Sequence, residues 1–299
     1  MSMSIAAVVL NYGTPDDTLL AVRSLLASSH PVTPLLVVDN ASGDDSVARL
    51  RMLPGVDLLP LPANGGFSAG CNAGIRCALD SSPTAVLLVN SDAVVPPDAV
   101  ARLALALESD ARAGIAGPLV RSRTNPDVIE SAGISYDMST GRMRLRHNGE
   151  RVHPESDGAT LVDAVSGCAM LVRRQVFDEV GFLAEEYFFG FEDIDFCLRA
   201  RARGWATYCD PSVFVLHEGH RSIGRRSGRR LYFATRNHLL LATRFPPRGS
   251  WLTRAVRLAM VMALNLGHAA SGRVAPRVAG LAGWTRGVVD FARGRFGAV

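Results

Sequence analysis

Three carboxylates lie close together in the stretch FFGFEDIDFCLRARARGW, residues 188–205. Glu192, Asp193 and Asp195 have phenylalanines on both sides, and an acid that is shielded from water holds its proton more tightly. A carboxylate with a raised pKa can serve as a general base near neutral pH. The alternative is structural, because acids are favoured at a helix N-terminus and Asp195 can pair with Arg199 one turn later.

Polar side chains also stand where short apolar runs end. These residues are Asn11, the pair Asp39-Asn40 and the triplet Asn90-Ser91-Asp92. If the runs are parallel strands, their carboxyl ends meet at the edge where open α/β sheets bind ligands. A carboxylate such as Asp92 suits a divalent cation, and Asp39-Asn40 can hydrogen-bond a nucleoside. The alternative is that these residues only form turns and helix caps.

Two further segments carry the same ambiguity. His217 ends the run VFVLH and can complete a metal site or steady a phosphate, but a lone histidine after an apolar strand is often structural. His220 and Arg221, just beyond it, can meet a diphosphate. Asn64-Gly65-Gly66 lets the backbone approach a ligand ahead of a helix N-terminus; it lacks the spacing of a dinucleotide or Walker motif and is also compatible with a plain turn.

The elements that must position these residues alternate along the first 120 residues. Apolar runs with strand character are followed by segments with helical spacing, the first opened by Thr14 and Pro15. This alternation predicts βαβ units and a mostly parallel sheet. The predicted strands are 5–12, 35–40, 56–61 and 85–90, and the predicted helices are 14–29, 44–53, 67–79 and 97–109.

The pattern changes after residue 120. Residues 121–160 are expected to form loops and short strands, and an apolar pattern returns at 161–174. We expect helices at 173–181 and 194–204, then a pair of strands within 206–219. The basic, glycine-containing segment 222–230 is a candidate boundary, followed by helical patterning at 232–245 and 251–270.

Seven segments in this order resemble the family 2 glycosyltransferases, which have the GT-A fold. They are VVLNYGTPDDTLLAVRSLL, LLVVDNASGDDS, NGGFSAGCNAGI, LLVNSDAVV, SGCAMLVRR, VGFLAEEYFFGFEDIDFCLRARARGW and VFVLHEGHRSIG, and they span about residues 4–225. The bacterial rhamnosyltransferase-like branch, which builds cell-surface polysaccharide, is the subgroup most resembled. The resemblance implies an α/β GT-A nucleotide-diphospho-sugar transferase fold, with a mostly parallel Rossmann-like sheet flanked by helices.

The resemblance also implies a role for each matched residue. Asp39 would contact the nucleoside with Asn11 and Asn40 near it, while Asn64, Gly65 and Asn72 would line the nucleotide pocket. Asn90-Ser91-Asp92 stands where the family has its DxD-type motif; because the first Asp is Asn here, Asp92 would carry most of the coordination of Mg²⁺ or Mn²⁺, with His217 as second ligand. Gly167 and Cys168 would shape the floor between donor and acceptor. Asp193 would be the catalytic base, and Glu192 would position the acceptor.

The implied reaction is an inverting transfer from a nucleotide-diphosphate sugar to a hydroxyl of a glycan or lipid-linked acceptor. The branch makes dTDP-L-rhamnose the first expectation for the donor. Alternatives are a UDP-sugar donor with a soluble or secondary-metabolite acceptor, or a non-catalytic protein that binds nucleotide sugars on the same scaffold. The implied domains are 1–225, catalytic, with a nucleotide-sugar half up to about 120 and an acceptor half from 121, and 226–299, a C-terminal helical extension.

Charge is distributed unevenly between these two parts. All 32 basic residues are arginine; residues 1–220 hold 17 of them with 27 acids, and residues 221–299 hold 15 with a single acid, Asp290. A basic, partly apolar extension is expected to contact an anionic membrane surface or to pack on the catalytic domain or within a homo-oligomer. Nucleic acid is not expected as a partner, because the extension has few aromatics and matches no nucleic-acid-binding module.

The remaining composition bears on the compartment. Five scattered cysteines without a CxxC pair do not indicate a zinc site or a disulfide framework, so a reducing cytoplasm is expected, with peripheral attachment to the inner face of the plasma membrane. The start of the chain lacks a basic n-region and is typical of a buried strand rather than of a signal peptide.

Overall fold

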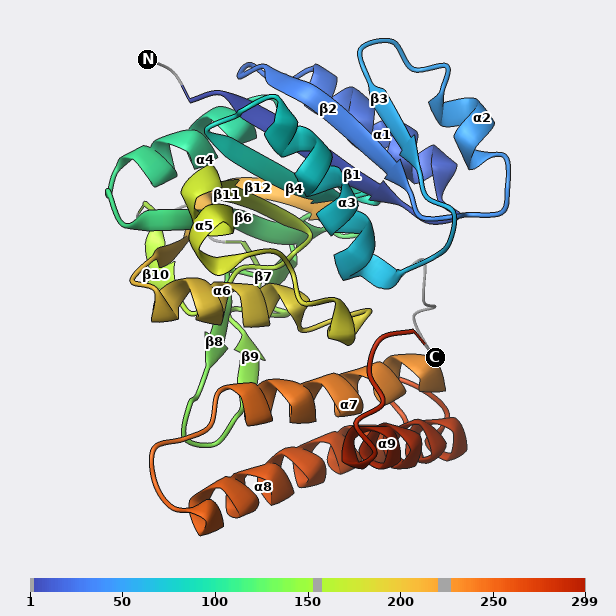
Figure 1. Cartoon of the computed structure of the whole chain (residues 1–299), viewed down its shortest axis with the longest axis vertical. Helices are drawn as coiled ribbons and strands as arrows, with labels where there is room; N and C mark the ends of the chain where they lie inside the picture. Colours follow the sequence, from blue (N-terminus) through green and yellow to red (C-terminus); the bar gives the residue numbers. More distant parts are fainter. Residues whose placement is uncertain (1–2, 153–157, 220–226, 299) are drawn as a thin grey trace.

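The computed structural model describes residues 3–152, 158–219 and 227–298. Within them a central twisted sheet is flanked by helices on both faces, and a separate layer of three helices lies below it (Figure 1). The strands that run through the sheet have the order β10-β12-β6-β11-β4-β1-β2-β3. Their bounds are β1 (Ile5–Asn11), β2 (Val32–Asp39), β3 (Asp57–Pro60), β4 (Ala85–Asn90), β6 (Ala113–Ser122), β10 (Thr160–Val162), β11 (Ala169–Arg173) and β12 (Ala206–His217).

The sheet is mostly parallel, as predicted. β1 pairs in parallel with β2 and β4, and β2 pairs in parallel with β3. β11 enters antiparallel between β4 and β6, and β12 then runs parallel to β6. The short strands β5 (Ala93–Val94) and β7 (Ile129–Ser131) pair with β12 and β6, while β8 (Ile134–Tyr136) and β9 (Met143–Leu145) form a separate hairpin.

Burial of both faces explains why β1 reads as one continuous apolar run. Ile5, Ala7 and Val9 point into a core shared with helices on one side, and their neighbours point into a core on the other side. Helices α1 (Pro15–Leu26) and α4 (Ala99–Glu108) cover the first face. Helices α3 (Gly66–Asp80), α5 (Arg174–Val180) and α6 (Glu192–Ala202) cover the second, and the short α2 (Ser46–Leu50) lies beside β2 and β3.

Most predicted elements are present, with one correction. Residues 206–219 were predicted to form two strands, but Ala206–His217 is one strand, β12. Its pairing with β6 changes register between Asp210 and Phe214, around Pro211, so the irregular segment bends the strand without ending it.

The layer below the sheet consists of α7 (Gly228–Arg244), α8 (Trp251–Ala270) and α9 (Arg277–Ala292). The first two were predicted from their periodicity, whereas α9 was not. Its glycines allow close packing on α7, because a Cβ at Gly283 would lie 2.3 Å from the carbonyl oxygen of Gly228 and one at Gly287 would lie 2.8 Å from that of Tyr232. The β8-β9 hairpin reaches down to this layer, where His238 hydrogen-bonds the carbonyl of Gly141 (Figure 1).

We find no helix in the described ranges that has both the length and the apolar character needed to cross a bilayer.

Candidate active site

One cavity of about 290 Å³ opens at the carboxyl ends of β1, β2 and β4 and is bounded by the segment before α6. Four of the polar residues predicted at strand ends, Asn40, Asn90, Ser91 and Asp92, and the acids that begin α6 therefore meet in a single space. Its lining includes Tyr12, Asn40, Asn64, Gly66, Phe67, Asn90, Ser91, Asp92, Ser166, Gly167, Cys168, Phe188, Phe189, Gly190, Glu192, Asp193, His217 and Arg229.

The wall at β2 and α3 is built from two asparagines. The Asn40 amide nitrogen donates to Asn64 Oδ1 at 3.0 Å and to the Gly66 carbonyl at 3.1 Å. Asn64 Oδ1 also accepts from the backbone N–H of Gly66 at 2.8 Å. These contacts hold the glycine turn that opens α3 against the end of β2. Gly65 adds its backbone N–H to Asn40 Oδ1 at 3.3 Å.

Asn11 and Asp39 form the layer behind this wall. They are register partners of β1 and β2, and the Asn11 amide donates to Asp39 Oδ1 at 2.7 Å. Ser42 donates its hydroxyl to the same oxygen at 2.6 Å, and its backbone N–H donates to Asp39 Oδ2 at 3.1 Å. Neither Asn11 nor Asp39 lines the cavity, so they brace the Asn40 wall from behind.

Asp92 and His217 meet because two strand ends are paired. β5 pairs antiparallel with β12, with Ala93 opposite His217, which places Asp92 Oδ1 3.3 Å from His217 Nε2. His217 Nδ1 lies 3.0 Å from Glu130 Oε2, so a carboxylate from β7 orients the ring. Asn90 Oδ1 is buried and has no hydrogen-bond partner.

The charges of this pair support each other. Burial alone would raise the Asp92 pKa, but the contact with His217 outweighs it and the pKa lies below the usual value. Burial would lower the His217 pKa, but its contacts with Cys168, Asp92 and Glu130 raise it. Within the described ranges, no group of three His, Cys, Asp or Glu side chains converges as a metal cluster.

Glu192 and Asp193 begin α6 and point into the same cavity. Asp193 Oδ2 accepts the backbone N–H of Gly167 at 2.9 Å, and Oδ1 accepts that of Ile194 at 2.8 Å. Burial raises the Asp193 pKa in spite of these bonds. Burial and the neighbouring Asp193 charge raise the pKa of Glu192 to about 8, and Glu192 Oε2 is buried without a partner. A raised pKa makes a carboxyl group a better proton acceptor, and the pKa of about 8 places that of Glu192 near neutral pH.

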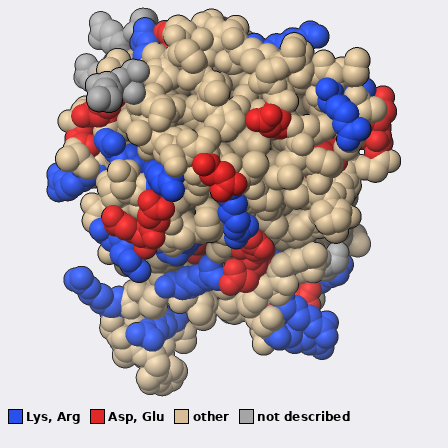
Figure 2. Space-filling model, turned by 45° about the horizontal axis from the view of Figure 1, so that its top comes forward, with Lys and Arg blue, Asp and Glu red and all other residues tan. Residues whose placement is uncertain are grey.

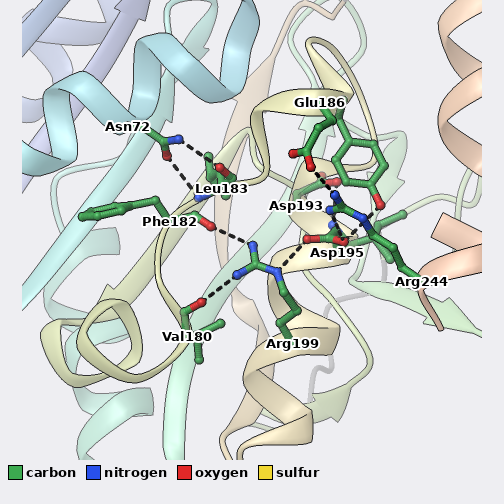
Figure 3. A network of polar contacts seen from close by, with 11 residues as sticks. Asn72, Val180, Phe182, Leu183, Glu186, Asp193, Asp195, Arg199 and Arg244 are labelled. Atoms are coloured by element: carbon green, nitrogen blue, oxygen red, sulfur yellow. Dashed lines mark hydrogen bonds and ion pairs between the residues drawn. The ribbon is translucent and has the colours of Figure 1, made fainter. Parts of the chain in front are cut away.

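The third acid of the stretch has a structural task. Asp195 is fully buried and accepts from Arg199 Nε at 2.7 Å, from Arg244 at 3.2 Å and from the Tyr187 hydroxyl at 3.0 Å. Arg199 continues to the carbonyls of Val180 and Phe182 (Figure 3). The alternative interpretation, a salt bridge inside the helix, is therefore right for Asp195.

The structure places Asn72 outside the cavity. Its amide nitrogen donates to the Leu183 carbonyl at 2.9 Å, and its Oδ1 accepts the Leu183 N–H at 3.0 Å (Figure 3). The same nitrogen donates to Glu185 at 2.8 Å. Both the nitrogen and the oxygen of the Asn72 amide are thus hydrogen-bonded to residues 183–185. Asn72 therefore supports the loop that leads to Glu192 and Asp193. The prediction that it lines the nucleotide pocket does not match this position.

Some residues of the site were not predicted. Glu130, which contacts His217 but does not line the cavity, lies in a weakly periodic region. Arg229 lines the cavity from α7, beyond the segments that carry the resemblance, while Ser166, Phe67 and Tyr12 adjoin motifs that could have pointed to them. The suggested phosphate contacts of His220 and Arg221 lie outside the described residues.

The fold and this site define a nucleotide-sugar transferase of the GT-A type, and the comparisons agree. The family model "Glycosyltransferase like family 2" matches residues 3–238. The chain belongs to this family, and the protein is a glycosyltransferase.

The most informative relatives are rhamnosyltransferases. N-acetylglucosaminyl-diphospho-decaprenol L-rhamnosyltransferase of Mycobacterium tuberculosis is 32% identical over 247 residues, which cover 75% of this chain and 78% of that protein. dTDP-rhamnosyl transferase RfbF of Shigella flexneri is 25% identical over 249 residues, covering 81% and 80%. Among solved structures, the mannosyltransferase PcManGT of Pyrobaculum calidifontis, in complex with GDP-Man and Mn²⁺, superposes with a TM-score of 0.61 at 15% identity over 98% of this chain and 88% of that one.

Proposed function

We propose that the protein transfers L-rhamnose from dTDP-L-rhamnose to a hydroxyl of a lipid-linked glycan, with inversion at the anomeric carbon. The main support for this proposal is that one cavity is lined both by the Asp92–His217 pair and by the acids Glu192 and Asp193. The first pair suits a sugar diphosphate and the second a hydroxyl that must lose its proton. The names of the two rhamnosyltransferase relatives support the choice of donor and acceptor.

The residues present fit a divalent cation. Asp92 offers a carboxylate and Asn90 a buried oxygen that lacks a partner, and His217 would offer an imidazole nitrogen once the proton shared with Asp92 is displaced by the cation. Mg²⁺ and Mn²⁺ accept such ligands and usually complete their coordination with substrate phosphates and water. A bound cation would supply charge neutralisation for the diphosphate leaving group. Asp92→Ala should weaken Mn²⁺-dependent nucleotide binding by tenfold or more, on the order of 1.4 kcal/mol, and unchanged metal dependence would remove Asp92 from this role.

The chain's own groups perform the remaining steps. The Asn40–Asn64 wall and the N-terminus of α3 hold the nucleotide. Asp193, fixed by the Gly167 N–H, accepts the proton of the acceptor hydroxyl as that oxygen bonds to the anomeric carbon and the bond to the diphosphate breaks. Glu192 positions the acceptor. The phenylalanines of the 188–191 segment limit water access to the reacting atoms.

Calorimetric titration tests the donor class. We expect dTDP to bind more tightly than UDP or GDP, and only with Mn²⁺ or Mg²⁺ present. Preferred binding of UDP would replace rhamnose by a UDP-sugar donor. A single-turnover assay with the activated donor separates catalysis from mere binding, because a binding protein would release the sugar unchanged.

The helical layer formed by α7, α8 and α9 has a surface that suits the proposed lipid-linked acceptor. The outer face of α8 carries Leu252, Val256 and Met260 at four-residue spacing, exposed by 42–56%, while Arg257 and Val261 face inward. Exposed arginines occur in the same helical layer, among them Arg254, Arg273, Arg277, Arg286, Arg293 and Arg295, and blue side chains are seen over the lower part of Figure 2. An apolar stripe in a layer with exposed cations favours an anionic membrane surface, the place where a lipid-linked acceptor is found.

This attachment would be peripheral and on the cytoplasmic side, in agreement with five cysteines that are all free. Flotation with liposomes that contain anionic lipid tests it. The native protein should float, and Val256→Asp should not. Leu105→Asp is the matched control, since Leu105 is equally apolar and exposed on α4. Failure of the native protein to float would refute the membrane contact.

A further inference from the structure

The backbone just before the catalytic acids is strained. Phe188 has φ 61° and ψ −50°, and the Phe189 N–H donates to the Tyr187 carbonyl at 2.6 Å, which together form a γ-turn of the rare positive-φ kind. Phe191, which precedes Glu192, also has a positive φ of 76°. Neither position has a glycine to relieve the strain, so surrounding contacts must hold this conformation.

Asn237 of α7 supplies the first of these contacts. Its side chain is fully buried, and its amide nitrogen lies 2.8 Å from the Tyr187 carbonyl oxygen and 2.9 Å from those of Phe189 and Gly190. Three carbonyls of the strained turn thus converge on one amide group with two hydrogens. The Tyr187 carbonyl also accepts the Phe189 N–H, whereas the carbonyls of Phe189 and Gly190 have Asn237 as the side-chain donor that satisfies them, so the turn relies on this amide.

Arg236 extends the support by one residue. Its fully buried guanidinium donates to the carbonyls of Glu186 at 3.2 Å and Tyr187 at 2.9 Å. It contacts the Tyr232 hydroxyl at 3.2 Å, and that hydroxyl donates to Asp290 Oδ2 at 3.0 Å. Asp290 is the only acid after residue 220. It is buried, pairs with Arg286 and Arg295, and lies near Arg236 through the Tyr232 hydroxyl, so its negative charge favours the buried guanidinium.

The supported turn connects both walls of the cavity. The carbonyl of Phe188 accepts the Phe67 N–H at 2.6 Å, at the first turn of α3. A Cβ on Gly66 would lie 2.5 Å from that same carbonyl oxygen, so the contact leaves no room for a side chain. Shortly after the turn, Glu192 begins α6 and Asp193 follows it.

We infer that Arg236 and Asn237 of α7 are positioning residues of the active site, which hold residues 186–190 in the strained turn that sets Glu192 and Asp193 in the cavity. They touch neither substrate nor reacting atoms and act through the backbone. This inference rests on the proposed function only for the roles of the two acids. It makes α7, which lies beyond the predicted catalytic domain, a part of the catalytic unit.

The test compares buried asparagines in the same helical layer. Asn237→Ala should lower kcat for sugar transfer at least tenfold and change the Kd for the donor nucleotide much less. The turn meets the nucleotide wall only at the Phe67 N–H and Gly66, and the Asn40–Asn64 contact does not involve it. Hydrogen exchange of the amides of residues 186–191 should become faster. Asn237→Ser keeps one hydrogen-bond donor and should give values of kcat and of amide exchange between those of the native protein and Asn237→Ala. It replaces the alanine variant in the test if that variant does not fold.

Asn265→Ala is the matched control. Asn265 is also buried, and it bonds His238 and the Val261 carbonyl but not the turn. It should lower Tm without changing kcat or the exchange of residues 186–191. Equal losses in both variants, or unchanged exchange and kcat in Asn237→Ala, would overturn the inference. If Asp193→Asn turned over normally while Asn237→Ala still lost protection at the turn, only the proposed base would be wrong.

Discussion

The two walls of the cavity are stabilised in different ways. The wall at the ends of β1 and β2 is held by neighbours in the sheet: Asn11 and Asp39 are register partners, and Asn40 bonds Asn64. The wall that carries Glu192 and Asp193 follows a strained turn and is held by α7, from a more distant part of the chain. The first wall is a consequence of strand pairing, whereas the second exists only when a distant helix has docked. Substitutions in the second wall should therefore abolish sugar transfer while nucleotide binding at the first wall is retained.

The sharpest test of this division is Asp193→Asn. It removes the base from the second wall and preserves shape and the acceptor atom for Gly167. We expect kcat to fall by roughly 10² to 10⁴, with the Kd for the nucleotide unchanged by calorimetry. Substantial remaining turnover would assign the proton to another group, with Glu192 as the first alternative.

A stability test compares two ion pairs. Arg199→Met leaves Asp195 fully buried with fewer partners, so the free energy of unfolding should fall by about 3 kcal/mol in urea titrations. Arg49→Met removes a pair with Asp16 on the surface near α2 and should cost less than about 1 kcal/mol. Equal effects would mean that the second wall does not depend on its buried network.

The last test is the pH dependence of stability. Burial and Asp193 raise the Glu192 pKa from 4.5 to about 8, so the folded state binds this proton more tightly than the unfolded state. The resulting stabilisation is complete below pH 4.5 and is lost as pH rises through about 8. Glu192→Gln should therefore flatten the decline in unfolding free energy between pH 4.5 and about pH 8, by on the order of 4 kcal/mol at pH 8.

The exposed Glu108→Gln is the control for that measurement, because a solvated carboxylate at the end of α4 should leave the pH profile unchanged. If the native protein and Glu192→Gln had parallel profiles between about pH 4.5 and pH 8, the buried Glu192 would not be holding its proton in the folded state.

The difference between the two walls also explains which parts of the site could be predicted from the sequence. Strand alternation indicated a mostly parallel sheet, and the polar residues at strand ends indicated a ligand site where parallel strands end at one edge. The GT-A fold, the pocket roles of Asn40 and Asn64 and the association of Asp92 with His217 came from the resemblance to the family. The order of the motifs indicated the family. Glu192 and Asp193 were singled out because phenylalanines surround them in the sequence. The pairing of Asp195 with Arg199 was predicted from their spacing of four residues in a helix.

The rest depends on contacts that no local pattern encodes. Arg236 and Asn237 read as ordinary members of a predicted helix, and nothing in their neighbourhood points to carbonyls near residue 187. Asn72 lies in a segment typical of the nucleotide pocket, but its side chain turns toward Leu183. α9 was not predicted because glycines interrupt its apolar spacing, although those glycines are what permits its packing.

That packing has a consequence for large-scale mutagenesis. Asp290 reaches Tyr232, and through it Arg236, only because Gly283 and Gly287 let α9 lie directly on α7. Any side chain at these positions would push the two backbones apart and withdraw the counter-charge from beneath the turn. A scan of all single substitutions, scored by activity alone, would therefore mark glycines on a helix remote from the cavity as intolerant as the acids themselves.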